Sequence, residues 1–535
     1  MKSIFKTTIL SLAVIVSVSS CNDALDITQA GELNGESTFT NTNDLDKYLN
    51  GAVYTSLDIT NNLFLSAQIT DELGMGPQNS ELALSAHQFY LDITNGPTSG
   101  IWLGNYTTIN RANRLLVGAK GIMPAESERA RYNNVVSQTR LIRAFSYFTL
   151  LSYFSTDMKD PNALGVMLIE DVPELTETKP RVVNSQIFAL IDADIAFAES
   201  NLTTSGDYYR ITKNFLNAFK ARYYLYRGMY PQAKAAAQAV LNTSGLSLTV
   251  ASPPNPGNLA QNNQAHKDLN AYTSKNPYVK MWNNTDTGNP RELIFSLNRP
   301  QLQSWGNIVT LFATNASQAN GSILYDMGRK TFNLYASTPG DIRRFAYIDP
   351  TAVINSNYAT IDNYRALDVL VIDKYPGRAT LAPDPIPTDP TREKVLSQNV
   401  LRNDIPIFRL SEMYFILAEC AVEEGSFTTA ATLIKNVRDA RNYLGPVDLP
   451  VYSSKQQAYV DILLERRKEL YLEGHRYLDL KRLGAIAGVA IDRDPTDDVK
   501  TIPVTIPIND YRMRSLPIPR AELQGNPTIQ QNPGY

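Results

Sequence analysis

The densest group of charged residues lies in the stretch LERRKELYLEGHRYLDLKRLG, residues 464–484, where ten of 21 residues are Asp, Glu, Lys or Arg. Three glutamates in it, at positions 465, 469 and 473, are four residues apart and would share one face of a helix. Carboxylates grouped in this way could bind a metal ion or act in acid/base catalysis. The interleaved arginines and lysine compete for the same carboxylates, however, and the leucines and tyrosines favour burial. We therefore predict a structural charged network, formed by Glu465, Arg466, Glu469, Glu473, Arg476 and Asp479.

The other candidate groups give no catalytic signature. The acidic stretch DRDPTDD, residues 492–498, resembles a calcium loop but lacks the central glycine and the closing glutamate, so we expect a solvated loop. His87, His266 and His475 are far apart in sequence, which argues against a histidine-based metal site. No P-loop or G-x-S-x-G stretch stands out, and nothing points to the paired carboxylates of a glycosidase. We predict no catalytic residue, no bound metal and no cofactor.

The N-terminus has the pattern of a bacterial lipoprotein signal peptide. Lys2 and Lys6 precede a mostly apolar run at residues 9–18, which is too short to span a bilayer. The sequence VSSC then resembles a lipobox and predicts lipidation of Cys21, which would hold the protein on a membrane surface. An ordinary secretory signal with an incidental cysteine is the alternative. The boundaries we expect are residues 1–20 for the signal peptide and 21–43 for a lipid-anchored tether.

Composition and charge exclude some classes of protein. With 535 residues, the chain is long enough for one large core or for several domains. Its hydrophobic content of 43% is ordinary for a globular protein. The net charge of −3 predicts no general attraction to nucleic acid or to anionic lipid.

Apolar residues recur at helical spacing over much of the chain. This periodicity predicts helices at residues 44–60, 105–118, 126–154 and 184–200. Two helix pairs, at 212–241 and 409–441, each have a short turn and small alanines, as is typical of tetratricopeptide repeats. Unrelated helical hairpins are the alternative. Because one such repeat cannot bury its own face, we expect the pairs to stack against neighbouring helices.

The segment between these pairs has a different composition. Residues 243–403 are rich in Asn, Pro, Gly, Thr and Tyr, which predicts turns and short strands packed on the helical body. Loops on a rigid scaffold commonly carry ligand contacts. We expect a mainly α-helical single unit over residues 44–535, with a helical body and an irregular ligand-binding part with short strands. The body covers mainly 105–242 and 404–484, and the loop-rich part mainly 60–104 and 243–403.

Several stretches, in their order along the chain, resemble the SusD/RagB family of Bacteroidetes nutrient-uptake lipoproteins. They are the lipobox, WLGNYTTINRANRLL (102–116), QTRLIRAFSYFTLLSYF (138–154), RLSEMYFILAEC (409–420), the charged stretch 464–484 and LPIPRAELQGNPTIQQNPGY (516–535). The likeness therefore covers the whole chain after the signal peptide. One departure is STDMKDPNALGVML at residues 155–168, where the family often has a shorter motif.

The resemblance implies a SusD-like fold, with four tetratricopeptide-type repeats opposite an irregular ligand-binding part. Members of the family act as a lid on a SusC-like TonB-dependent outer-membrane barrel and have no enzymatic activity. For this chain the resemblance implies an outer-membrane lipoprotein that faces the cell exterior and captures an oligomer for import. We expect no nucleic-acid partner, because the net charge of −3 predicts no general attraction to nucleic acid.

Aromatic and amide side chains are the ligand contacts we expect, because aromatic rings stack on sugar faces and amides bind hydroxyl groups. Trp102 and Asn105 match positions that can contact glycans in the family. Four further aromatics are candidates because they lie in loop-rich sequence: Tyr90, Trp282, Trp305 and Tyr325. For each of them, packing in the core is the alternative.

Three functions remain open at this point. The first is a lid that captures an oligosaccharide, and the second is the same lid with oligopeptides as cargo. The third is a tetratricopeptide scaffold that binds only other proteins. The sequence favours glycan over peptide only through the habits of the family that it resembles.

Overall fold

The computed structural model describes eleven segments of the chain, which together include most of the helical body. These segments are residues 39–79, 84–174, 176–203, 207–253, 277–282, 292–298, 323–348, 352–361, 367–375, 403–497 and 504–535. The predicted signal peptide, Cys21 and Trp305 lie outside them. Within these segments, every helix is too short or too polar to cross a lipid bilayer.

The first described helices follow one another closely along the chain, with one interruption before α5. Asn41 caps α3 (Thr42–Tyr48), which continues through a π-helical turn (Leu49–Val53) into α4 (Tyr54–Ser56). The helix expected at 44–60 ends at Ser56 because Leu57 has an extended backbone. A new helix, α5, then runs from Thr60 to Gln68.

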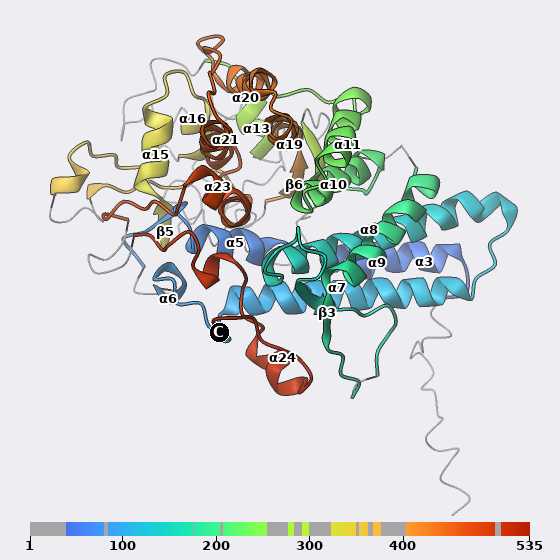
Figure 1. Cartoon of the computed structure of the whole chain (residues 1–535). Helices are drawn as coiled ribbons and strands as arrows, with labels where there is room; N and C mark the ends of the chain where they lie inside the picture. Colours follow the sequence, from blue (N-terminus) through green and yellow to red (C-terminus); the bar gives the residue numbers. More distant parts are fainter. Residues whose placement is uncertain are drawn as a thin grey trace, which may run out of the picture.

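Three longer helices lie side by side in the lower layer of the molecule (Figure 1). They are α7 (Gly96–Lys120), α8 (Arg129–Phe154) and α9 (Asn184–Asn201), and a 3₁₀ turn (Glu126–Glu128) precedes α8. The helix α7 begins earlier than the residue 105 that we expected. The side chain of Asn95 accepts a hydrogen bond from the backbone N–H of Thr98 at 3.0 Å, and Pro97 favours a first helical turn.

The two predicted helix pairs form hairpins and stack on each other in the upper layer. The first contains α10 (Lys213–Tyr226) and α11 (Tyr230–Thr243), and the second contains α19 (Leu410–Glu423) and α20 (Phe427–Arg441). Gly228 (φ 71°) and Gly425 (φ 74°) provide the left-handed residues of the two turns. The helix α11 packs against α19, so each hairpin covers a face that the other leaves apolar.

The remaining elements are short. Past α20 come α21 (Lys455–Glu469), α22 (Arg476–Asp479), a π-helical turn (Leu480–Gly484), α23 (Ala485–Ala487), a 3₁₀ turn (Tyr511–Met513) and α24 (Arg520–Gly525). The described parts of the loop-rich sequence contain more helix than expected: α6 (Leu84–His87), α13 (Pro277–Trp282), α15 (Arg329–Ala336), α16 (Arg343–Tyr347) and a 3₁₀ turn (Tyr358–Thr360).

The strands that the structure describes form three antiparallel pairs, two of which join distant parts of the chain. They are β1 (Leu73–Met75) with β5 (Tyr325–Met327), β2 (Leu164–Met167) with β3 (Arg181–Val183), and β4 (Leu293–Leu297) with β6 (Ile405–Arg409). The fold is thus mainly helical with short strands, as predicted, and the pair β4–β6 ties the loop-rich sequence to the residues directly before α19.

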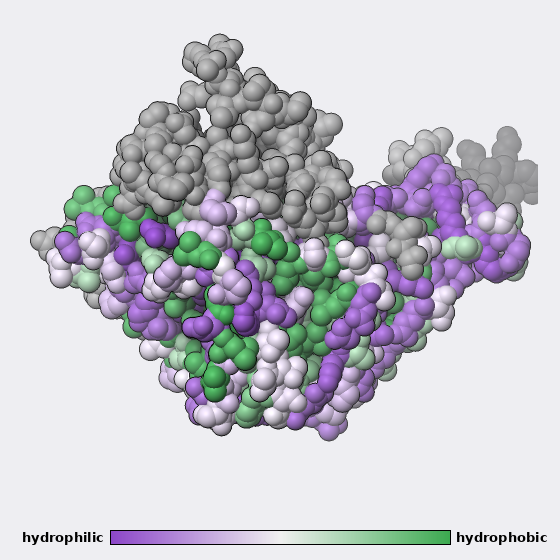
Figure 2. Space-filling model, turned by 90° about the horizontal axis from the view of Figure 1, so that it is seen from above, coloured by the Kyte–Doolittle hydropathy of each residue, from purple (hydrophilic) through white to green (hydrophobic). Residues whose placement is uncertain are grey.

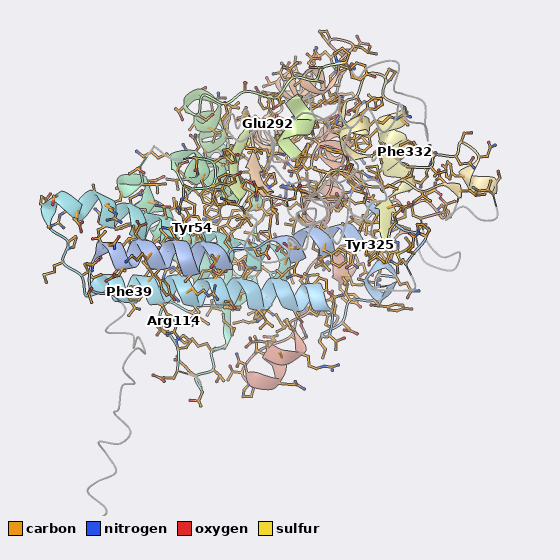
Figure 3. The ribbon with its side chains drawn as sticks, turned by 180° about the vertical axis from the view of Figure 1, so that it is seen from behind. Phe39, Tyr54, Arg114, Glu292, Tyr325 and Phe332 are labelled. Atoms are coloured by element: carbon orange, nitrogen blue, oxygen red, sulfur yellow. The ribbon has the colours of Figure 1, made fainter. Side chains whose placement is uncertain are left out.

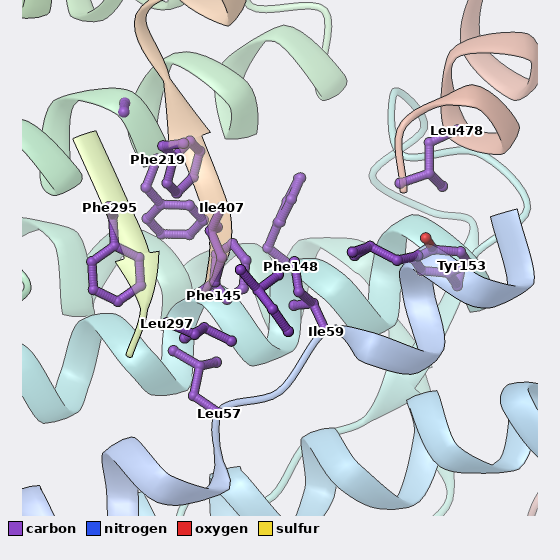
Figure 4. Packing of buried hydrophobic residues seen from close by; sticks show 14 of the residues in the cluster. Leu57, Ile59, Phe145, Phe148, Tyr153, Phe219, Phe295, Leu297, Ile407 and Leu478 are labelled. Atoms are coloured by element: carbon purple, nitrogen blue, oxygen red, sulfur yellow. The ribbon is translucent and has the colours of Figure 1, made fainter. Parts of the chain in front are cut away.

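One large apolar core joins the two layers. Phe145 and Phe148 on α8 meet Phe219 on α10, with ring centroids 5.9 and 5.8 Å apart, and Phe295 on β4 and Ile407 on β6 pack beside them (Figure 4). All five side chains are at least nine-tenths buried. Burying a side chain of this size contributes roughly 1.5–3 kcal/mol, so the core binds the hairpins to the lower helices. On the upper face, apolar residues form small groups among polar ones (Figure 2).

Candidate functional site

The charged stretch at 464–484 does not form one continuous helix. The helix α21 ends at Glu469, and Leu472 (φ 57°) and Gly474 (φ 79°) then adopt left-handed conformations. Our expectation that three glutamates share one helical face was therefore wrong for Glu473, which follows the end of the helix. Glycine suits position 474 because it accepts a positive φ without steric strain.

Glu469 lies at the centre of a buried ion network. Its carboxylate accepts hydrogen bonds from Arg441 at 2.8 Å, Arg409 at 2.9 Å and Arg343 at 3.1 Å. All four side chains are no more than 1% exposed. Burial acts to raise the pKa of Glu469, but Arg441 and Arg409 hold it well below its usual range. This carboxylate therefore stays ionised and is a poor proton acceptor.

The network continues into the loop-rich sequence. Glu292, directly before β4, lies 2.6 Å from Arg409, and Lys374 donates to Glu473 at 2.6 Å. The Lys374 ammonium also lies 4.0 Å from the ring centroid of Trp282, which is 1% exposed. Burial lowers the pKa of Lys374 to about 8, whereas the Glu473 carboxylate and the Trp282 ring favour the charged form. Trp282 thus packs against the charged network and is not exposed to a ligand. Glu292 lies in the upper half of the molecule (Figure 3).

The charges of this network balance. Among the described residues, ion pairs join six basic and six acidic side chains: Arg343, Lys374, Arg409, Arg438, Arg441 and Lys468 with Glu292, Asp341, Asp461, Glu465, Glu469 and Glu473. A cavity of about 370 Å³ reaches the outer edge of the network beside Asp341 and Arg438. Apart from Asp448, the charged residues that line the cavity form ion pairs within the network, so the cavity offers a ligand few free partners.

Two smaller clusters hold the remaining charges of the stretch apart from Lys481. Arg476 forms a bidentate pair with Asp71, at 2.7 and 2.8 Å, and Arg466 donates to Asp479 at 2.7 Å. Arg482 pairs with Asp479 at 3.1 Å. Each of the six side chains that we assigned to a charged network is at least nine-tenths buried and ion-paired. Since their carboxylates are engaged by arginine or lysine, the arrangement has a structural role and supplies no free acid or base, and removal of one partner would leave a charge buried and unpaired.

Trp102 and Asn105 lie in the interior. Trp102 is fully buried, its ring packs edge-on against Phe154 at 4.8 Å, and its Nε1 donates to Glu522 at 3.0 Å. The amide of Asn105, 6% exposed, donates back to the carbonyl oxygen of Ile101 at 2.7 Å. In this structure both side chains have packing roles and present almost no surface to a ligand.

Tyr325 is also buried, at the end of the molecule formed by β1 and β5 (Figure 3). Its hydroxyl accepts a hydrogen bond from Gln68 at 3.0 Å, and its ring meets Phe64 edge-on at 5.6 Å. Trp305 lies outside the described residues. Of the six predicted ligand contacts, Tyr90 is therefore the one that the structure shows at the surface.

Tyr90 is 66% exposed and stands on a strained turn after α6. The preceding residue, Phe89, has φ 64°, a conformation that costs a non-glycine residue roughly 1–2 kcal/mol. The backbone N–H of Tyr90 donates to the carbonyl oxygen of Ser85 at 2.7 Å. Phe89 itself points inward and is 2% exposed, so the turn buries one aromatic ring and displays the next.

Two arginines that the sequence did not single out support this turn. Arg493 is 1% exposed, lies 4.4 Å from the ring centroid of Phe89, and donates to the backbone carbonyls of Thr70 and Gln68 at 2.7 and 2.8 Å. Arg512 donates to the carbonyl oxygen of Phe89 at 2.9 Å. Gln68 also bonds Tyr325, so the turn, the end of α5 and β5 are held as one unit.

The acidic stretch around Arg493 is not the solvated loop that we expected. Asp494 and Asp497 are 9% and 7% exposed, and a carboxylate oxygen of Asp497 accepts a hydrogen bond from the backbone N–H of Arg329 at 2.7 Å. Asp492 pairs with Lys330 at the surface. Arg493 draws the stretch inward, because a buried guanidinium needs several acceptors close by. In the described part of the chain, no cluster of three or more histidine, cysteine or acidic side chains suits a metal ion.

Comparison with known proteins finds relatives that match large parts of the chain. A sequence profile described as the SusD family matches residues 389–535. A SusD-like protein of Formosa agariphila is 25% identical over 431 residues, which cover 74% of this chain and 72% of that protein. Another SusD-like protein, from Bacteroides ovatus, is 27% identical over 163 residues, or 28% of each chain.

Solved structures share the fold. A putative sugar binding protein from Bacteroides vulgatus superposes with a TM-score of 0.69 at 21% identity, over 93% of this chain and 99% of that one. A laminarin binding SusD-like protein superposes with a TM-score of 0.62 at 21% identity, over 93% of this chain and all of that one. The helical body and the loop-rich part thus belong to one shared architecture.

Proposed function

Because this chain belongs to the SusD/RagB family, we propose that it captures an oligosaccharide at the cell surface and delivers it to a SusC-like TonB-dependent outer-membrane transporter, for which it is the lid. The carbohydrate-binding proteins of the SusD family are non-catalytic, so the cargo is bound and released unchanged. Cys21 anchors the protein by its lipid to the outer membrane, facing the exterior. Oligopeptides are the alternative cargo, and a protein-binding scaffold is the alternative role.

The observation that carries the carbohydrate proposal is the display of Tyr90 on a fold shared with sugar-binding structures. Its ring is two-thirds exposed, and Phe89 and Arg493 fix the direction of the turn that bears it. A sugar ring has apolar C–H faces that stack on such an aromatic surface. A turn that is already ordered loses little conformational entropy on binding, which favours affinity.

Isothermal titration calorimetry with the purified full chain tests this proposal. We expect saturable binding of an oligosaccharide, with laminarin-derived oligosaccharides as the first probes and mixed peptides as the competing class. Tyr90→Ala should weaken sugar binding about tenfold, the equivalent of one aromatic contact of about 1.4 kcal/mol. The matched control is Leu444→Ala, since Leu444 is 70% exposed on the loop after α20.

Each outcome separates the functions. Sugar binding that is lost in Tyr90→Ala and kept in Leu444→Ala supports the proposed site. Peptide binding alone supports oligopeptide cargo. Binding of neither, together with recovery of a partner protein other than an outer-membrane barrel, supports the scaffold. For the anchor, Cys21→Ala should abolish incorporation of labelled fatty acid. The outer-membrane barrel should co-purify with the lipidated protein that keeps Cys21.

A further inference from the structure

A second cavity, of about 400 Å³, lies where the C-terminal end of α8 meets the segment from α22 to Gly484. Its charged lining residues are Asp157, Lys159, Lys481, Arg482 and Arg514, four cations and one carboxylate. The cavity is separate from the Tyr90 turn and from the Glu469 network. Part of its wall comes from residues 155–168, the stretch in which this sequence departs from the family pattern.

One of the four cations is already neutralised. Arg482 donates to Glu419 at 2.9 Å and to Asp479 at 3.1 Å. Arg466 shares both carboxylates, with its guanidinium 2.7 Å from Asp479 and 3.6 Å from Glu419. Two guanidinium groups thus face two carboxylates, and Arg482 adds no net charge to the cavity. The excess comes from the other three cations against Asp157.

Lys481 is placed to receive an anion. Its ammonium donates to the backbone carbonyls of Ser152 and Ser155, both at 2.7 Å, which satisfy the end of α8. These bonds use two of the three N–H donors of an ammonium group. Burial lowers the pKa of Lys481 to about 7, and Asp157 opposes this shift. An anion that enters the cavity would therefore stabilise the charged form of Lys481.

Arg514 and Lys159 are also available to contact an anion. Arg514 is exposed, and its guanidinium forms no ion pair with the residues that the structure describes. Lys159 donates to the hydroxyl of Tyr230 at 3.3 Å, which leaves its charge without a carboxylate. Leu478 and Tyr226, both buried, form an apolar part of the wall. A cavity lined by both cations and apolar side chains suits a ring that carries an acidic substituent.

We propose that this cavity binds an oxyanion, the sulfate or carboxylate group of an acidic saccharide or a free inorganic anion of the same shape, between Lys481, Arg514 and Lys159. The site is independent of the proposed carbohydrate capture at Tyr90.

The test is calorimetry of the full chain with sodium sulfate and with a sulfated oligosaccharide, at constant ionic strength set by chloride. Arg514→Gln should weaken sulfate binding about tenfold, because it removes one charge-assisted contact. Arg520→Gln is the matched control, since Arg520 is equally an exposed arginine of the C-terminal segment but does not line the cavity. Tighter binding of the saccharide than of sulfate, weakened in Arg514→Gln but kept in Tyr90→Ala, assigns the site to a saccharide, and equal binding of the two assigns it to a free anion.

Proton uptake gives a second readout. At about pH 8, a lysine with a pKa near 7 is mostly neutral, so an anion held by its ammonium form must draw a proton from the buffer. The binding enthalpy should then change with the ionisation enthalpy of the buffer, and Lys481→Met should abolish that change. Lys481→Met also removes the cap of α8, so Arg514→Gln remains decisive if the lysine variant fails to fold. Absence of saturable binding, or an equal loss in Arg520→Gln, would overturn the proposal.

Discussion

Replacing Arg409, a buried residue, by methionine should destabilise the protein severely while leaving its surface residues unchanged. The guanidinium of Arg409 makes five hydrogen bonds: two to the Glu473 carboxylate at 2.8 Å, one to Glu292 at 2.6 Å, one to the Glu469 carboxylate at 2.9 Å and one to the Glu469 backbone carbonyl at 3.0 Å. Methionine keeps much of the apolar stem but removes the charge. The network would then hold five basic and six acidic groups, with one negative charge unmatched in the interior.

The expected loss is smaller than the sum of those five bonds. Each of the three carboxylates keeps another partner: Lys374 for Glu473, and Arg441 for both Glu292 and Glu469. Breaking a buried ion pair by removing one partner costs roughly 3–5 kcal/mol, because an uncompensated charge remains buried. We expect Arg409→Met to lower the free energy of unfolding by an amount in this range.

Urea unfolding followed by circular dichroism measures this loss. The control is Arg131→Met, because Arg131 also pairs with a carboxylate, Asp46, at 2.8 Å but with its side chain 45% exposed. A surface pair of this kind contributes roughly 0–1 kcal/mol. Equal, small losses in the two variants would refute the reasoning, since they would show that the interior network contributes no more than a solvated pair.

Three further changes test other parts of the structure. Burial raises the pKa of Glu72 to about 7, whereas its unfolded pKa is roughly 4.3. The folded state therefore holds the proton more tightly, and the stability that this provides is complete below the unfolded pKa. As the pH rises through 7, the free energy of unfolding should fall by on the order of 3 kcal/mol. Glu72→Gln should remove that loss, which urea unfolding at about pH 5 and about pH 8 would measure. Trp102→Ala should lower the free energy of unfolding by roughly 3–5 kcal/mol through cavity formation, whether or not a ligand is present. Gly474→Ala should cost roughly 1–2 kcal/mol because alanine resists a φ of 79°.

Specific results would contradict these predictions. A pH dependence that is unchanged in Glu72→Gln would mean that another group controls it, Asp497 first, because burial also raises the pKa of that carboxyl. A Trp102→Ala variant that keeps full stability but loses sugar binding would assign Trp102 to the ligand rather than to the core. A neutral Gly474→Ala would show that the turn after Glu469 can adopt another conformation.

The helices could be predicted because their apolar periodicity is a local property of the sequence. The hairpins at 212–241 and 409–441 formed within a few residues of the predicted bounds, as did the helix that ends at Phe154. The start of α7 was missed because the capping signal of Asn95 and Pro97 lies ten and eight residues before residue 105, where we expected the helix to begin. The break after Glu469 depends on the left-handed conformation of Leu472, a residue type that gives no sign of it.

The sites were harder to predict because they depend on partners far along the chain. The sequence indicated a charged network around Glu469, but it did not identify Glu292 or Arg343, which lie more than 100 residues away. Aromatic residue type alone did not separate Tyr90 from Trp102, because only the tertiary packing decides which ring is exposed. Arg493 was overlooked because the aspartates around it suggested a solvated loop.

The same long-range pairing constrains the order in which the molecule can assemble. Asp71 lies 405 residues before its partner Arg476, and Glu292 lies 117 residues before Arg409. At a synthesis rate of roughly 5–20 residues per second, Asp71 waits on the order of 20–80 s for that guanidinium. A nascent chain that lacks the last quarter of the sequence therefore has carboxylates that it cannot bury, and the two layers should close only after the ribosome has finished. Such a chain must stay open until this last part of the sequence has been made.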